Sequence, residues 1–261
     1  MPIKINYSKK NKDKSPSNLI LFSNDKFNLN NLKKYLLESE FSYISDLLKT
    51  SELKKNLLVF ELTSKKKVVL VSIKNNFKNS DIENLGAELF GRINYGKNNE
   101  YDIISDSITA KHNNFLGHFL HGAKLKSYEF NKYKSKKDTR NILINIVGDK
   151  NKPSEKNQLK FQALEAGTFY ARDLVSEPGN ILHPDEYAKR LNSLKKDGLK
   201  ISIYDEKKLK KLGMHALLGV GQGSVRGSYL VTMEWNGAKN NSQPLAFVGK
   251  GVCFDTGGYS L

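Results

Sequence analysis

The chain has 261 residues, of which 38% are hydrophobic and 10% aromatic, so it can bury the core of one large domain or two ordinary ones. Its 43 Lys and Arg residues outnumber its 27 Asp and Glu residues, which gives a formal net charge of +16. A single cysteine, Cys253, excludes an intramolecular disulfide and is typical of a reducing compartment.

The N-terminal stretch "MPIKINYSKKNKDKSPSN" lacks the apolar region of a signal peptide. No apolar run approaches the roughly 18 residues that span a bilayer. We therefore expect a cytoplasmic protein without a membrane partner.

The charge surplus could indicate a nucleic-acid partner, but its make-up argues otherwise. Only five residues are arginines, the better side chain for bidentate contacts to phosphate and guanine. The remaining positive charge is lysine scattered along the chain, which is more typical of a solvated surface. Nucleic-acid binding stays possible but is not favoured.

The first part of the chain alternates apolar runs with stretches of helical periodicity. The predicted strands are residues 18–23, 56–63, 67–74, 101–105 and 141–149. One helix is expected to begin at Ser80 or Asp81 and to end at Gly96, and a second covers residues 108–128. This alternation predicts an α/β layer fold.

The second part begins after the polar, lysine-rich residues 149–156. A long helix is predicted at about 154–176, with Leu159, Ala163, Ala166 and Tyr170 on one apolar face. We accordingly expect an N-terminal α/β domain at 1–150, followed by residues 151–261 as a connecting helix and a second α/β domain.

Two shorter helices follow the long one. Pro184 is expected in the first turn of one helix, and Gly198 is expected to end that helix. Asp205 is expected to cap the other helix. The predicted strands of this part are residues 199–205, 228–236 and 244–249.

The last of these strands, "PLAFVG", is almost purely apolar, and such runs belong in the centre of a sheet buried on both faces. A central strand so near the last residue lacks later elements to cover it. We therefore expect an incomplete second domain, with a mostly buried sheet.

The stretch "VGKGVCFDTGG" places Lys250 and Asp255 just beyond that strand, where open α/β sheets carry their binding sites. The glycines allow a tight turn, and apolar neighbours would desolvate the Lys250 amine and lower its pKa. A neutral amine and a carboxylate can both ligate a metal ion. A tight turn with a surface Lys–Asp ion pair is the alternative.

Other candidate features are expected to be structural. His118 and His121 are three residues apart, but no carboxylate or cysteine at suggestive spacing makes them metal ligands. "GVGQGS" at 219–224 lacks the glycine spacing of a dinucleotide loop. Cys253 is expected to pack in a buried segment, and Trp235 to lie in a core or a subunit contact.

Four stretches in order resemble the leucyl (cytosol) aminopeptidases. Residues 247–261, "FVGKGVCFDTGGYSL", are similar to that family's "VGKGxTFDSGGxSxKP". Residues 213–237 resemble its "GMxxLLxVGQGSxxxPxLxxLxYxG", and residues 170–191 its "xARDLxNxPxNxxxPxxxAxxA". A weaker likeness covers residues 119–137, so the resemblance extends over about 119–261.

The resemblance implies an N-terminal macro-like α/β domain, a connecting helix and an α/β catalytic domain holding two divalent metal ions, Mn²⁺ or Zn²⁺. Lys250 matches the lysine whose amine ligates one ion, and Asp255 matches the aspartate that bridges both. The implied activity is release of N-terminal residues, leucine-type, from peptide substrates. The implied assembly is a homohexamer.

The sequence departs from the family pattern after Leu261, where the catalytic lysine, the further carboxylate ligands and the "DAEGR" segment would follow. Two ligands are too few to hold a pair of divalent ions against water. We therefore expect a chain that is truncated within the catalytic domain and inactive alone. The alternative is a non-catalytic fragment that binds nucleic acid or a nucleotide through its basic N-terminal domain.

Overall fold

The computed structural model describes residues 3–7, 18–50, 55–95, 99–109, 111–136, 141–238 and 243–254. The chain forms two compact units, Met1–Arg172 (unit 1) and Asp173–Leu261 (unit 2). In the ranges that the structure describes, no helix is long and apolar enough to cross a membrane.

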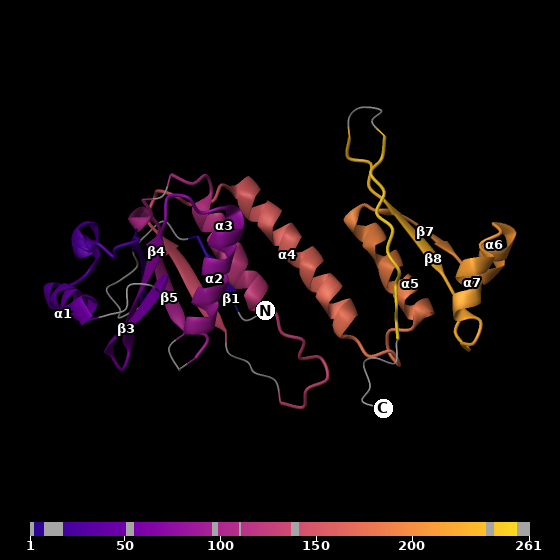
Figure 1. Cartoon of the computed structure of the whole chain (residues 1–261), viewed down its shortest axis with the longest axis horizontal. Coiled ribbons are helices and arrows are strands. Elements are labelled where there is room, and N and C mark those ends of the chain that lie inside the picture. The colour runs from indigo at the N-terminus through magenta and orange to yellow at the C-terminus, as the bar shows by residue number, and fades with distance from the viewer. Residues whose placement is uncertain are drawn as a thin grey trace. The chain divides into compact units, whose positions relative to one another are not determined.

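Unit 1 is built on a six-stranded sheet with the order β1-β6-β5-β2-β4-β3 (Figure 1). All neighbouring strands are parallel except β3 and β4, which are antiparallel. The strands are β1 (Ile3–Asn6), β2 (Asn18–Asn24), β3 (Leu57–Thr63), β4 (Lys66–Ile73), β5 (Glu100–Ile104) and β6 (Ile142–Val147). The predicted α/β fold is confirmed.

The central strands are apolar on both faces, as the continuous Val, Leu and Ile runs predict. In β2, Ile20 and Phe22 belong to one core cluster, whereas Leu21 between them belongs to the other. In β4, Val69 and Val71 alternate in the same way with Leu70. The sheet therefore needs helices on both sides.

Helices cover both faces of the sheet (Figure 1). The 3₁₀ helix η1 (Asn30–Tyr35) and α1 (Glu38–Thr50) pack Leu32 and Ile44 on one face. On the other face, α2 (Asn79–Ile93) and α3 (Phe115–Lys126) join the larger cluster. A single 3₁₀ turn, η2 (Ser105–Ser107), follows β5.

The beginnings of these helices differ partly from the expectation. Helix α2 begins at Asn79, with Lys78 as its N-cap residue and Asp81 accepting the Lys78 backbone N–H at 2.8 Å. The predicted end at Gly96 lies outside the described residues. The prediction of helix from residue 108 is wrong, because α3 begins only after Asn114, which has a left-handed φ of 60°.

Two glycines let α2 and α3 approach to backbone contact. A Cβ on Gly86 of α2 would clash with the carbonyl oxygen of Phe119, and one on Gly122 of α3 would clash with that of Glu83. Only glycine leaves room for main chains this close.

Helix α4 (Glu155–Ser176) runs from unit 1 into the first residues of unit 2. The predicted apolar face is wrong: Leu159 is 59% exposed, and Ala163 and Ala166 are exposed too. The buried stripe is instead Phe161, Glu165 and Phe169, spaced four residues apart. The aromatic residues bury more area than the alanines, and this determines which face packs.

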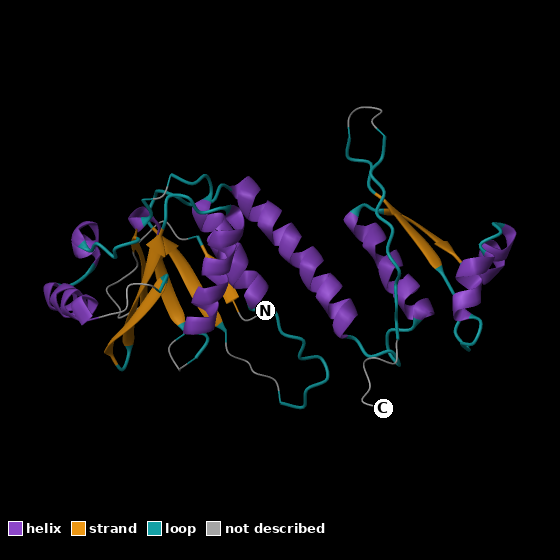
Figure 2. Cartoon of the chain, viewed as in Figure 1, coloured by secondary structure: helices purple, strands orange, loops and turns teal. Residues whose placement is uncertain are grey.

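Unit 2 contains a two-stranded antiparallel sheet of β7 and β8 together with short helices (Figure 2). Its elements are α5 (Pro184–Asn192), η3 (Ser193–Asp197), β7 (Lys200–Tyr204), α6 (Glu206–Lys211), α7 (His215–Gly221) and β8 (Leu230–Glu234). Pro184 stands in the first turn of α5, Gly198 has the left-handed φ of 91° that ends η3, and Asp205 caps α6 by accepting the Lys208 backbone N–H. These three predictions are confirmed.

The predicted strand at 244–249 is wrong. Residues 243–254 form an extended loop (Figure 2), in which Leu245 is 79% exposed, Phe247 89% and Val248 100%. A strand requires a neighbour with which to pair, and no strand of the described ranges pairs with this segment.

Replacement of Gly122 by alanine should destabilise unit 1, because the new methyl group would force the α2 and α3 backbones apart. We expect a loss of about 2 kcal/mol in the free energy of unfolding, as for other overpacked cores. Urea unfolding followed by far-ultraviolet circular dichroism measures it.

The matched control is Gly91→Ala in the same helix pair, since a Cβ at Gly91 meets nothing within 4 Å. Alanine favours the helix at such a site, so the control should be neutral or slightly stabilising. Equal effects of the two substitutions would contradict the close backbone packing.

Replacement of Arg190 by methionine should destabilise unit 2. Arg190 Nη1 lies 2.9 Å from Glu177 Oε1, and only 2% of the Glu177 side chain is exposed. Loss of the guanidinium would remove a charge partner from a buried carboxylate, at a cost of about 3 kcal/mol. Urea unfolding followed by far-ultraviolet circular dichroism measures the loss.

Lys189→Met provides the control one residue earlier. The Lys189 side chain is 81% exposed and lies 3.6 Å from Glu186, so its removal should change stability by less than about 0.5 kcal/mol. An Arg190 variant as stable as this control would mean that the buried pair contributes nothing.

Candidate functional site

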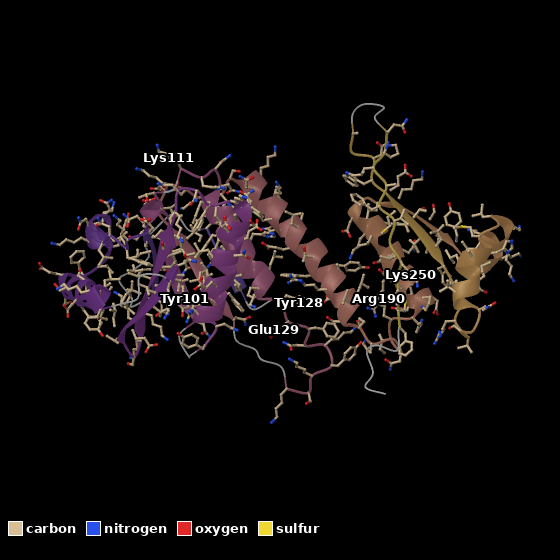
Figure 3. The ribbon with its side chains drawn as sticks, in the orientation of Figure 1. Tyr101, Lys111, Tyr128, Glu129, Arg190 and Lys250 are labelled. Atoms are coloured by element: carbon tan, nitrogen blue, oxygen red, sulfur yellow. The ribbon has the colours of Figure 1, made fainter. Side chains whose placement is uncertain are left out.

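Lys250 lies on the extended segment 243–254 that follows β8, where Figure 3 labels it. The residue is exposed, and the Val252 backbone N–H donates to its carbonyl oxygen at 3.1 Å. The apolar surroundings that the sequence suggests for the amine are therefore not formed around it here.

Glycines allow this segment to run close to the beginning of α5. A Cβ on Gly251 would lie 2.9 Å from Cε1 of Tyr187 in α5. A Cβ on Gly179, in the turn before α5, would lie 3.1 Å from the Cys253 carbonyl oxygen. The glycine-rich sequence thus sets the path of the segment that carries Lys250.

A small charged cluster stands at the N-terminus of α5. His183 is the N-cap residue, and its Nδ1 is hydrogen-bonded to Asp185 Oδ1. Arg226 Nη1 lies 3.2 Å from Asp185 Oδ2. Partial desolvation raises the pKa of Asp185, but hydrogen bonds from its backbone and His183, with the Arg226 charge, outweigh it and leave the pKa lowered.

Cys253 lies near this cluster and is half-buried. Burial raises the pKa of its thiol, and the negative charge of Asp185 raises it further. The thiol therefore stays protonated at neutral pH, which does not fit a nucleophile. The buried segment expected around Cys253 is not formed, because its neighbours in residues 243–254 are exposed.

The described residues do not by themselves fit a pair of divalent metal ions. In that part of the chain, no group of three or more His, Cys, Asp and Glu side chains comes together as a metal site. Asp255, the second expected ligand, lies outside the described residues. The ligand roles of Lys250 and Asp255 therefore stay predictions.

The two histidines of α3 have carboxylate partners that the sequence does not reveal. His118 Nδ1 lies 2.8 Å from Glu83 Oε1 of α2, and His121 Nδ1 lies 3.1 Å from Glu165 Oε1 of α4. Both partners are at least 35 residues away in sequence, so local spacing gives no sign of them. Both pairs belong to unit 1.

The remaining candidates are structural in part. Residues 219–224 hold the last turn of α7 and the turn after it, as expected of a sequence that is no dinucleotide loop. Trp235 is 69% exposed and Met233 51% exposed, so neither lies in a core of this chain. A subunit contact at Trp235 stays a prediction.

Comparison with known protein families gives one family match. Residues 169–261 match the family model described as "Cytosol aminopeptidase family, catalytic domain". The matched part contains the Lys250 segment and all elements of unit 2 from α5 onward.

Two curated relatives show how far the similarity extends. The chain is 41% identical over 191 residues to a "Probable cytosol aminopeptidase" of Nitrobacter winogradskyi, covering 70% of this chain and 38% of the relative. It is 48% identical over 146 residues to a "Probable cytosol aminopeptidase" of Brucella suis biovar 1, covering 54% of this chain and 29% of the relative. The chain thus spans well under half the length of these relatives.

Solved structures show the same fold. A mutant of tomato leucine aminopeptidase matches with a TM-score of 0.71 at 18% identity, over 88% of this chain and 50% of that one. The bottromycin maturation enzyme BotP, in complex with Mn, matches with a TM-score of 0.63 at 17% identity, over 85% and 46%. The family match and the curated relatives thus assign residues 169–261 to the catalytic domain of the cytosol aminopeptidase family, and the solved structures show a similar fold.

Proposed function

We propose that the whole protein is a metal-dependent aminopeptidase that releases N-terminal residues, leucine-type, from peptides. The observation that carries this proposal is the family match over residues 169–261, which includes the segment around Lys250. The names of the curated relatives support it.

The proposed metal ligands in this chain are Lys250 and Asp255. An amine and a carboxylate, together with further ligands that the described residues do not supply, would hold divalent ions. We propose Mn²⁺ or Zn²⁺, and the Mn complex of BotP supports the first choice.

The proposed organisation follows the family pattern. Residues 1–150 would form the macro-like N-terminal domain, and residues 151–261 the connecting helix with part of the catalytic domain. Cytoplasmic location and assembly into a homohexamer are further parts of the proposal; the relatives' name, cytosol aminopeptidase, supports the location.

A chimera tests the proposed function. Residues 169–261 replace the corresponding segment of the Brucella suis relative, which supplies the rest of its own sequence. We expect the chimera to hydrolyse leucine p-nitroanilide when Mn²⁺ is added. Lys250→Ala in the chimera should lower kcat/KM by about two orders of magnitude or more, because the contribution of a bound metal to catalysis is several kcal/mol.

Lys207→Ala in α6 is the matched control, since Lys207 is an exposed lysine of the same unit. It should leave kcat/KM unchanged. An active host enzyme together with an inactive chimera, or a Lys250 variant as active as the Lys207 variant, would refute the proposed role of the segment.

The 261-residue chain alone should not hydrolyse leucine p-nitroanilide, even with added Mn²⁺. Its described residues provide no group of three metal-binding side chains, and one amine with one carboxylate is too weak a ligand set. The assay compares the purified chain with buffer containing the same metal. Turnover that chelation abolishes would show that this expectation is wrong.

A further inference from the structure

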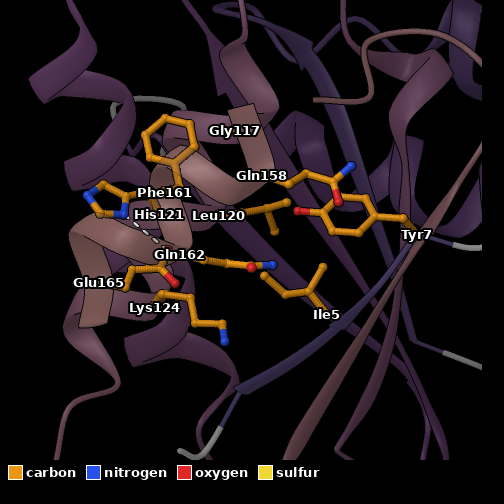
Figure 4. A pocket seen from close by; sticks show the side chains of 10 residues that line it. All are labelled: Ile5, Tyr7, Gly117, Leu120, His121, Lys124, Gln158, Phe161, Gln162 and Glu165. Atoms are coloured by element: carbon orange, nitrogen blue, oxygen red, sulfur yellow. Dashed lines mark hydrogen bonds and ion pairs between the residues drawn. The ribbon is translucent and has the colours of Figure 1, made fainter. Parts of the chain in front are cut away.

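Unit 1 contains a cavity of about 80 Å³ between β1, α3 and α4 (Figure 4). A single buried water needs about 10–15 Å³, so the space holds several waters or one small organic molecule. The lining residues all precede residue 166, and the cavity therefore lies outside the part of the chain that matches the catalytic-domain family model.

The lining includes a buried pair of ionisable side chains, His121 and Glu165. Their side chains are only 8% and 9% exposed, and His121 Nδ1 lies 3.1 Å from Glu165 Oε1. Burial of such groups costs free energy unless their polar atoms are satisfied. The second carboxylate oxygen of Glu165 has no hydrogen-bond partner among the residues that the structure describes, and it is available to a ligand.

Tyr7, which follows β1, adds a hydroxyl group from the other side of the cavity, opposite His121 and Glu165 in Figure 4. Burial raises the pKa of Tyr7 to about 12, with a further contribution from the Glu165 charge. The hydroxyl therefore stays protonated at neutral pH and can donate a hydrogen bond. Within the described ranges it makes none.

Lys124 brings a positive charge to the same lining, one turn after His121 on α3. Its ammonium forms no ion pair with any described residue. Gln162 of α4 contributes an amide that can both donate and accept. The cavity lining thus combines a carboxyl group, an imidazole, an ammonium group and neutral hydrogen-bonding groups.

The rest of the lining is apolar. Ile5, Leu120 and Phe161 provide an aliphatic and aromatic wall. A ligand with a purely polar surface would leave this wall in contact with polar atoms, whereas an aliphatic group would bury apolar area against it.

We propose that this cavity binds a free α-amino acid with an aliphatic side chain. Glu165 and the side-chain carbonyl oxygen of Gln162 accept hydrogen bonds from the ammonium group of the amino acid. Lys124 and the Tyr7 hydroxyl donate hydrogen bonds to its carboxylate. The side chain lies against Ile5, Leu120 and Phe161. The proposal does not depend on the aminopeptidase activity, because none of these residues belongs to the matched catalytic segment.

Calorimetric titration of the full chain with L-leucine and L-alanine, in the presence of a chelator, tests the proposal. We expect saturable binding of the amino acids. N-acetyl-leucine lacks the ammonium group and leucinamide lacks the carboxylate, so each should bind about tenfold more weakly or worse, as expected for a lost hydrogen bond to a charged group. Equal binding of all four compounds would overturn the zwitterion assignment.

Three variants locate the site. Glu165→Gln, Lys124→Met and Tyr7→Phe should each weaken leucine binding, with the two charge changes giving about a tenfold loss or more. The matched control is Glu83→Gln, which alters the other histidine–glutamate pair, at His118, outside the cavity lining. It should bind leucine like the unmodified chain.

Two further measurements keep the outcome clear. Circular dichroism shows whether Glu165→Gln is folded; if it is not, Tyr7→Phe, which removes a single oxygen atom, decides. Lys250→Ala should leave leucine binding unchanged, since Lys250 belongs to unit 2. Absence of leucine binding, or binding that the Lys250 variant abolishes and the cavity variants do not, would overturn the proposal.

Discussion

Backbone contact between α2 and α3 is the constraint on which the arrangement of unit 1 depends. The two helices meet where Gly86 and Gly122 have no side chain to separate them. This contact fixes the position of α3 over the sheet, and with it the directions of His118 and His121. The ring of Phe161 then packs on both histidines, at centroid distances of 5.1 and 4.8 Å, and brings α4 onto α3. The cavity beside Glu165 is a product of this order of packing.

The limits of the elements in unit 2 depend more strongly on local sequence signals than those in unit 1. A proline in the first turn and capping side chains define where α5 and α6 begin, and Gly198 ends η3. The buried Glu177 joins the turn before α5 to Arg190 near the end of that helix. The segment that carries Lys250 runs against these elements. Gly251 admits it close to Tyr187, and Gly179 leaves room for Cys253 of the segment.

Much of this fold could be predicted from the sequence, because strong local patterns decide it. Runs of Val and Leu identify β3 and β4, and Asp205 marks the start of α6. Strand β1 could not be found in this way: it has four residues, and it pairs with β6, about 140 positions later. The packed face of α4 was also beyond reach, since periodicity offers two stripes and only the tertiary contact of Phe161 and Phe169 selects one.

In the candidate sites, too, local sequence predicts some features, whereas others depend on contacts between distant segments. Lys250 stands out in sequence because glycines and charges at fixed spacing are rare beyond an apolar run, whereas its surroundings depend on other segments. Glu83 and Glu165 escape any local search, since they reach their histidines from separate helices. The predicted strand at 244–249 is wrong for a related reason: a strand requires a neighbouring strand with which to pair, and the described residues contain none for this segment.

That unpaired segment has a consequence for the behaviour of the chain in solution. Leu245, Phe247 and Val248 present apolar side chains and unpaired main-chain groups to water. An extended stretch of this kind can recruit the same stretch of another molecule, edge to edge, and grow into insoluble assemblies. The strong positive charge of the chain opposes this attraction by mutual repulsion, and salt weakens the repulsion. Ionic strength thereby sets the balance between dispersed molecules and aggregates.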